Sequence, residues 1–439
     1  MPERAPRRPS TVIGSIVLLL VSGIGVLWLA DRAAGWIADP RFTPLAGAPA
    51  TRSVLERPEF RVPVRINEAG FRGGPLPGAK PPGVYRIVAL GDSFTFGYGV
   101  RERQAYPARL ARRLNARSGG RARVEVVNLG VPGAGPLDYL WHLEHTGLAL
   151  HPDLVVVGLF ANDVNDLYQL RRFGARSALF TLTELQHGDA VERPWWKRAA
   201  GTALPNLYVL ASRALRLVSV SSEARAASPT VGGIGPDPAA IVAALGKRYG
   251  CEEAIALRYR ALPADDRAAL DRLLRGEPLG DDMRPVLLLA ALVDPEAEAD
   301  TILLRSPERR AAWNQTARVL TRIIALARDH GAETVIAALP ASEEVDQSRW
   351  SVLQSAGFRV YPAMLSDTFA TDAVHALATR EGAGFVDLVA AFRAHPDAGL
   401  YFVVDEHWNA RGQAYAAARL ADAIAPRVAV HAAVRESGT

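Results

Sequence analysis

The stretch VYRIVALGDSFTFG, residues 84–97, decides how the chain begins its folded domain. Its first half is an apolar run that predicts a buried strand, and this strand ends in Gly91-Asp92-Ser93 instead of an ordinary turn. Gly91 permits a tight turn, and Ser93 then falls at a helix N-terminus, where negative charge is stabilised. Ser93 is therefore either a nucleophile or only the cap of the next helix, and partners elsewhere in the sequence must decide.

Strands and helices alternate from this stretch onward. We expect strands over 85–90, 123–130, 152–160, 333–340 and 384–389, and helices over 106–119, 136–150, 310–331, 371–382 and 409–428. Alternation of this kind predicts a parallel sheet with helices on both faces and right-handed crossovers. The fold class is accordingly α/β, a three-layer α/β/α flavodoxin-like domain built from residues 83–167 and 307–430.

Residues 168–306 interrupt the alternation. This region contains helix-like runs such as DRAALDRLLRG and a Gly/Pro/Ser-rich piece near SPTVGGIGPDP. We expect a mostly helical insertion that serves as a lid, as an assembly element for envelope protein partners, or merely as a packing elaboration.

The N-terminus has the pattern of a membrane anchor. Residues 1–10 are basic, and TVIGSIVLLLVSGIGVLWLA, residues 11–30, carries no charge. A run of ~20 residues at 1.5 Å per residue covers about 30 Å, the thickness of the bilayer's hydrocarbon core. Basic residues before the span predict that the N-terminus is cytoplasmic and that the rest of the chain is extracytoplasmic. The protein would then be a single-pass protein of the bacterial inner (cell) membrane, with a periplasmic catalytic domain. Cleavage of the segment is the alternative.

Residues 31–82 are rich in Pro, Gly and Arg, and GGPLPGAKPPG, residues 73–83, shows no hydrophobic period. We expect this segment to be a tether, with one ordered piece over residues 62–73.

Composition argues against several other classes of protein. The net charge is +5 over 439 residues, without the basic stripe that a nucleic-acid-binding surface requires. The single cysteine, Cys251, excludes an intrachain disulfide and a cysteine-rich metal site. No phosphate-binding or dinucleotide-binding glycine motif is present, so no cofactor is expected. His142 and His145 flank Glu144 without a further ligand nearby, so no metal is expected either.

Partners for Ser93 follow the other strands. A serine needs a base to take its proton, and its attack creates an oxyanion that needs donors. The stretches NLGVPGAG (128–135) and LFANDVND (159–166) come at predicted strand ends, where sites of parallel sheets form. Asp405 and His407, two residues apart before the last helix, point to the same side of an extended segment and can bond directly. Together these pieces favour a serine nucleophile.

In these motifs the sequence resembles the SGNH (GDSL-like) hydrolase family over about 83–167 and 308–426. GDSFTFG resembles the family's first block, which carries the nucleophile Ser93. The resemblance implies that the backbone N–H groups of Ser93 and Gly133 and the side-chain amide of Asn162 form the oxyanion hole. It further implies that His407 is the base and Asp405 its orienting acid.

Two positions depart from the family pattern. Ala161 stands where the family often has glycine, and the last block is Asp-x-His instead of Asp-x-x-His. The shorter spacing resembles a membrane-anchored branch that acetylates or deacetylates extracellular polysaccharides, whose sites can also work as a Ser–His pair.

The resemblance implies a serine esterase or O-acyltransferase acting on an extracytoplasmic acyl ester, such as acetylated envelope or exported polysaccharide. The alternative is a non-catalytic accessory protein that binds a glycan or a partner in a polysaccharide assembly complex.

Overall fold

The computed structural model describes residues 45–165, 178–186, 237–277, 282–403 and 405–437, together with a few residues between 22 and 30. Two compact units are present, one formed by Met1–Thr43 with Glu184–Gly235 and one by Pro44–Thr183 with Pro236–Thr439. The elements discussed below belong to the second unit, except that the end of α6 (Ala178–Gln186), from Glu184 on, falls in the first. The expected basic N-terminus, and most of the expected span at 11–30, lie outside the described residues, and none of the described helices is long and apolar enough to cross a bilayer.

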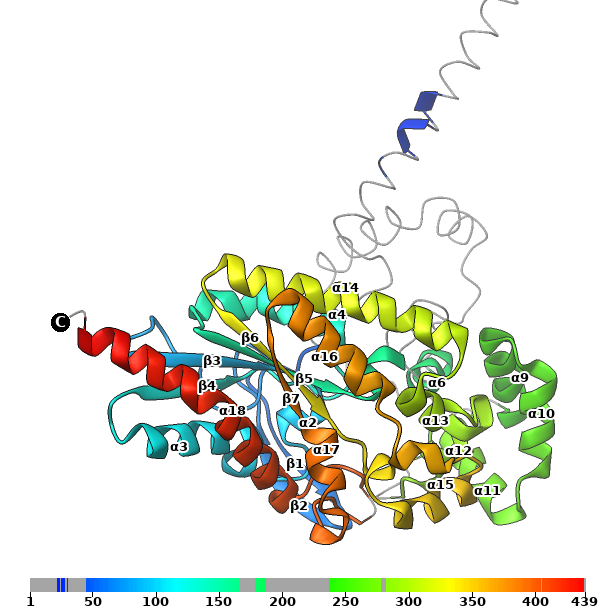
Figure 1. Ribbon diagram of the computed structural model, residues 1–439. Coiled ribbons are helices and arrows are strands. Elements are labelled where there is room, and N and C mark those ends of the chain that lie inside the picture. Colours follow the sequence, from blue (N-terminus) through cyan, green and yellow to red (C-terminus); the bar gives the residue numbers. More distant parts are fainter. Residues whose placement is uncertain are drawn as a thin grey trace, which may run out of the picture. The chain divides into compact units, whose positions relative to one another are not determined.

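A five-stranded parallel sheet forms the centre of the second unit (Figure 1). Its strands are β3 (Val84–Leu90), β4 (Arg123–Asn128), β5 (Leu154–Phe160), β6 (Glu333–Leu339) and β7 (Gly384–Asp387). Their order in the sheet is β4-β3-β5-β6-β7. In chain order this is 2-1-3-4-5, the flavodoxin-like arrangement. The expected α/β fold with a parallel sheet is confirmed.

Helices cover both faces of this sheet (Figure 1). On one face, α3 (Tyr106–Ser118), α17 (Leu388–Arg393) and α18 (Ala410–Ser437) pack on alternate strand residues such as Ile87 and Val156. On the other, α4 (Pro136–His142), α14 (Pro307–Asp329) and α16 (Phe369–Glu381) pack on the intervening residues, such as Val88 and Val157. Because every residue of β3 is buried, its aliphatic side chains each contribute about 1.5–3 kcal/mol through burial.

The region expected to be a helical insertion contains only helices among its described elements. These are α6 (Ala178–Gln186), α9 (Pro238–Tyr249), α10 (Glu252–Ala261), α11 (Ala264–Leu274), α12 (Arg284–Val293) and α13 (Ala297–Leu303). Helix α12 packs on α15 (Trp350–Ala356) through Ala291 and Leu353, which joins these helices to the segment that follows β6. Whether the region acts as a lid or in assembly stays a prediction.

The ordered piece expected over residues 62–73 is present, but the tether expected around it is wrong for residues 45–61, which belong to the folded unit. Strands β1 (Arg52–Arg57) and β2 (Phe60–Arg65) form an antiparallel hairpin closed by the two-residue turn Pro58-Glu59. Residues of β2 alternate between buried and exposed, and Phe71 beyond the hairpin is only 1% exposed. A segment with a buried apolar face cannot behave as a free linker, because detaching it exposes that face to water.

Candidate active site

The nucleophile turn joins β3 to the short helix α2 (Ser93–Phe96). Gly91 is required there, because a Cβ atom on it would lie 2.0 Å from Thr95 Oγ1. Asp92 caps the helix by accepting a hydrogen bond from Phe94 N at 2.9 Å. Burial raises the pKa of the Asp92 carboxyl to about 6, partly opposed by the positive charge available on His407. The turn thereby holds Ser93 at the carboxyl end of the central strand.

Ser93, His407 and Asp405 form one hydrogen-bonded chain. His407 Nε2 lies 2.8 Å from Ser93 Oγ, and His407 Nδ1 lies 2.6 Å from Asp405 Oδ1. The Asp405 and His407 side chains are 10% and 24% exposed, so a substrate can reach the imidazole while the carboxylate is largely shielded from water. This arrangement lets the imidazole take the hydroxyl proton while the carboxylate stabilises the imidazolium.

Aromatic rings enclose the imidazole on both faces. The Tyr98 ring is stacked on His407 with centroids 4.6 Å apart, and the Phe94 ring lies 5.0 Å away at 36°. Aromatic faces attract a cation by their quadrupole, so both rings favour the imidazolium that forms during the reaction. They also hold the ring plane, which fixes the direction in which Nε2 points.

The expected oxyanion donors follow the two strands that flank β3. Gly133 lies in the loop after β4, where it has a φ of +74° and is exposed, and Asn162 lies directly after β5. Because β4 and β5 pair with opposite edges of β3, the two loops approach Ser93 from either side. Their hydrogen bonding to an oxyanion stays a prediction.

A buried network links these two loops to each other. Asp163 accepts hydrogen bonds from Phe160 N at 2.9 Å and from the Tyr139 hydroxyl at 2.8 Å, and that hydroxyl also lies 3.2 Å from Ala134 O. The chain from β5 through Tyr139 to the loop after β4 fixes the position of Asn162 relative to Gly133. Such preorganisation is what an oxyanion site requires.

Two family models match parts of the chain that together contain all the expected site residues. A model described as GDSL-like Lipase/Acylhydrolase family matches residues 89–251, which contain Ser93, Gly133 and Asn162. A second, described as SGNH hydrolase-like domain, acetyltransferase AlgX, matches residues 299–437, which contain Asp405 and His407. The chain belongs to the SGNH (GDSL-like) hydrolases. It is a serine esterase or acyltransferase, and the family resemblance inferred from its motifs is confirmed.

Solved structures similar to this SGNH hydrolase include several esterases. The acetyl xylan esterase AlAXEase is 12% identical, with 77% of this chain and 99% of that chain covered and a TM-score of 0.34. Axe2, an acetylxylan esterase from Geobacillus stearothermophilus, is 12% identical, with 79% and 95% covered and a TM-score of 0.33. LAE5, an alpha/beta hydrolase enzyme from the metagenome of Lake Arreo, Spain, is 13% identical, with 79% and 95% covered and a TM-score of 0.34. The search of curated proteins gave no match.

Two residues that support the nucleophile turn of this hydrolase were not expected from the sequence. Asn128 donates to Thr95 O at 2.9 Å from the end of β4. Arg72, which is 5% exposed, donates to Phe96 O at 3.1 Å, to Gly97 O at 2.5 Å and to Val100 O at 2.6 Å. Burial lowers the pKa of the Arg72 guanidinium to about 10. Asn128 had a signal in the second motif, whereas Arg72 lay in the one ordered piece expected within the tether, where nothing distinguished it from other arginines.

The histidines considered as metal ligands lie away from this chemistry. His142 is buried against Phe71, with ring centroids 5.0 Å apart, and His145 is stacked on Trp141 at 4.3 Å. Among the described residues, no group of three or more His, Cys, Asp or Glu side chains is arranged to hold a metal ion.

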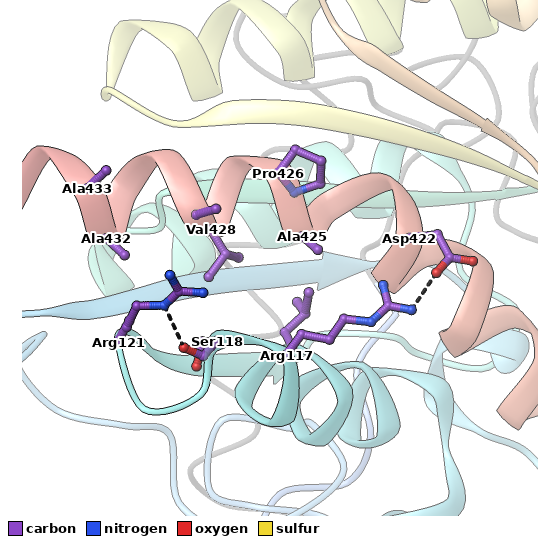
Figure 2. Close-up of a pocket in the computed structure, with 11 residues that line it drawn as sticks. Arg117, Ser118, Arg121, Asp422, Ala425, Pro426, Val428, Ala432 and Ala433 are labelled. Atoms are coloured by element: carbon purple, nitrogen blue, oxygen red, sulfur yellow. Dashed lines mark hydrogen bonds and ion pairs between the residues drawn. The ribbon is translucent and has the colours of Figure 1, made fainter.

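A pocket of about 380 Å³ lies between α3 and α18, and no residue of the triad lines it (Figure 2). In Figure 2, Arg117 reaches from α3 to Asp422 on α18, and the two bond at 2.5 Å. The other residues that line the pocket include Leu114, Val428 and Ala432. None of the residues that line it can act as a nucleophile–base pair, so it is not the reaction site.

Proposed function

We propose that this hydrolase transfers or hydrolyses the acyl group of an extracytoplasmic acyl ester, with acetylated envelope or exported polysaccharide as its substrate. The observation that carries the chemistry is the chain from Ser93 Oγ to His407 Nε2 at 2.8 Å and from His407 Nδ1 to Asp405 at 2.6 Å. The polysaccharide and the compartment rest on the match to an acetyltransferase domain and on the apolar run at residues 11–30.

In the first step, Ser93 Oγ forms a bond to the acyl carbon while His407 Nε2 accepts the hydroxyl proton. The carbonyl oxygen becomes an oxyanion that the N–H groups of Ser93 and Gly133 and the Asn162 amide stabilise. His407 then returns its proton to the departing alkoxide, which leaves as an alcohol and yields an acyl-serine.

In the second step, a hydroxyl group attacks the acyl-serine and His407 again takes its proton. Water as acceptor gives a carboxylic acid and makes the protein an esterase. A sugar hydroxyl gives a new ester and makes it an acyltransferase. In both cases Ser93 regains a proton from His407, so the site returns to its starting state.

The test uses the full-length protein in detergent micelles with p-nitrophenyl acetate, and compares the wild type with Ser93→Ala and His407→Ala. We expect both variants to lose hydrolysis by at least ~1000-fold, because nucleophile and base act as a unit. Acetylated and unacetylated oligosaccharides added to the same assay separate hydrolysis from transfer. Equal rates in all three proteins would refute the serine mechanism and favour the glycan-binding accessory protein.

A further inference from the structure

The segment that carries Asp405 and His407 has no regular structure of its own. An isolated β-bridge pairs Tyr401 with Trp408 and closes the residues between them into a loop, which we call the tip. Within the tip, Phe402 N donates to His407 O at 2.9 Å. The described residues of this tip belong to neither a helix nor a strand of the sheet. Contacts from other elements must therefore fix the two catalytic side chains.

Glu59, in the turn of the β1–β2 hairpin, binds the backbone N–H groups of this tip. Its Oε1 accepts from Val403 N at 2.5 Å, and its Oε2 accepts from Asp405 N at 2.8 Å. The next residue, Phe60, packs its ring on Phe402 with centroids 4.9 Å apart. Both oxygens of one carboxylate are thus used on the segment, and one of them holds the backbone of the orienting acid itself.

Arg349, after β6, binds the carbonyl groups of the same tip. Its Nη1 donates to Phe402 O at 3.1 Å and also to Val403 O. Its side chain is 10% exposed, and Nη2 lies 3.9 Å from Glu406. The N–H groups of the tip are therefore bound by Glu59 of the hairpin, and its C=O groups are bound by Arg349, which follows β6.

We propose that Glu59 is a positioning residue for the reaction. Its carboxylate fixes the backbone of Asp405, and through the Asp405–His407 pair it keeps His407 Nε2 within hydrogen-bond distance of Ser93 Oγ. The inference rests on the proposed function of the triad. Neither matched family model includes Glu59, because their residues begin at 89 and 299.

The size of the effect follows from the geometry. Hydrogen bonds to a carboxylate are about twice as strong as neutral ones, so two of them hold the tip firmly. A catalytic group misplaced by about 1 Å costs about 100-fold in rate. Replacement of the carboxylate by an amide keeps the shape but leaves one N–H of the tip without an acceptor. We therefore expect Glu59→Gln to lower kcat by about 10- to 100-fold while KM changes less than about twofold.

The experiment uses full-length protein in detergent micelles, with two readouts of Ser93. One is the rate at which a fluorophosphonate labels Ser93, when the Oγ–P bond forms, the P–F bond breaks and His407 takes the proton. The other is kcat and KM for p-nitrophenyl acetate. The matched control is Glu56→Gln, because Glu56 lies on the same hairpin and its 58% exposed side chain forms an ion pair with exposed Arg61. The control should match the wild type in both readouts.

A double variant separates positioning from a general effect on the fold. If Glu59 acts through Asp405 and His407, then Glu59→Gln combined with Asp405→Asn is hardly slower than Asp405→Asn alone. A purely structural role makes the two losses multiply. Thermal unfolding of each variant shows whether it is folded. If Glu59→Gln folds poorly, Glu59→Asp replaces it, because aspartate keeps the charge but has a shorter side chain.

The outcomes are distinct. Slow labelling of Glu59→Gln with unchanged KM and a non-additive double variant supports the inference. Labelling of Glu59→Gln within twofold of the wild type, or losses that multiply, overturns it while leaving the serine mechanism intact. A wild type that the fluorophosphonate labels no faster than Ser93→Ala overturns the proposed function and this inference together.

Discussion

The spacing of the last motif makes Asp405 the sharpest test of the mechanism. An Asp-x-His pair can serve as acid and base of a triad, or the site can work as a Ser–His pair alone. The structure places Asp405 Oδ1 2.6 Å from His407 Nδ1 with the Asp405 side chain only 10% exposed. We therefore expect Asp405→Asn to impair catalysis severely, because it removes the charge and favours the wrong imidazole tautomer.

The magnitude follows from the charge pair. Two unit charges about 4 Å apart at a partly hydrated site interact by about 4 kcal/mol, and each 1.36 kcal/mol in the barrier is about tenfold in rate. Asp405→Asn should thus lower kcat for p-nitrophenyl acetate by about 1000-fold. His407 is 24% exposed, so water can replace part of the lost stabilisation, and about 100-fold is the lower bound.

The assay compares wild type, Asp405→Asn and Asp405→Ala at saturating p-nitrophenyl acetate near neutral pH. Thermal unfolding of the same samples shows whether the variants are folded. A matched control is Asp422→Asn, because that carboxylate is 44% exposed on α18 and forms ion pairs with two partly exposed arginines, Arg117 and Arg419. A folded Asp405→Asn protein that keeps kcat within about tenfold of the wild type would refute the orienting role and leave a Ser–His pair.

Two further predictions concern stability. Arg72→Met should lower the free energy of unfolding by about 3 kcal/mol, because three carbonyl groups lose a charged donor. The control, Arg61→Met, should change it by less than about 1 kcal/mol. Equal melting temperatures of the two variants would show that Arg72 does not hold the nucleophile turn. The pKa of Asp92 is raised from 3.8 to about 6, so its contribution to stability is full below about pH 4 and is lost as the pH rises through about 6. Asp92→Asn should therefore gain about 2 kcal/mol relative to the wild type between pH 4 and pH 7 in urea unfolding, and a constant difference would contradict this.

The sheet and the triad could be predicted from the sequence because both have local signals. Strands such as β5 are continuous apolar runs, and covered parallel strands require such runs. The residues of each motif lie at strand ends, and a parallel sheet brings those ends to one edge. Asp92 and Asp163, which lie within two of these motifs, both bond their local backbone, although Asp163 also binds Tyr139 from another element.

The N-terminal hairpin could not be predicted with the same ease, although a signal existed. FRVPVR, residues 60–65, alternates buried and exposed positions as a half-buried strand does. The sequence analysis expected order only over residues 62–73, because the Pro- and Gly-rich residues that follow favoured a tether, and it did not assign a strand across Pro63. A proline is tolerated on an edge strand, and this two-stranded sheet consists only of edges.

Glu59 and Arg72 lacked any local signal, because their importance comes from contacts distant in the chain. Glu59 binds Asp405 across 346 positions, and Arg72 binds Phe96 across 24. In the sequence, Glu59 is one charged residue in a turn and Arg72 one of many arginines. Only the folded structure shows that the residues before the GDSFTFG motif contact both the nucleophile turn, through Arg72, and the segment of Asp405 and His407, through Glu59.

These contacts explain how a site with the shorter Asp-x-His spacing holds its geometry. Asp405 Oδ1 lies 2.6 Å from His407 Nδ1, and His407 Nε2 lies 2.8 Å from Ser93 Oγ, whereas the Glu406 carboxyl between the two residues lies 3.9 Å from Arg349 Nη2. Burial and neighbouring Glu343 raise the pKa of the Glu406 carboxyl to about 8, against the nearby positive charge of Arg349. Arg349 thus contacts both the Glu406 carboxyl and the carbonyl groups of the segment, while Glu59 binds its backbone N–H groups. The segment that carries Asp405 and His407 is therefore fixed by side chains from two other parts of the fold.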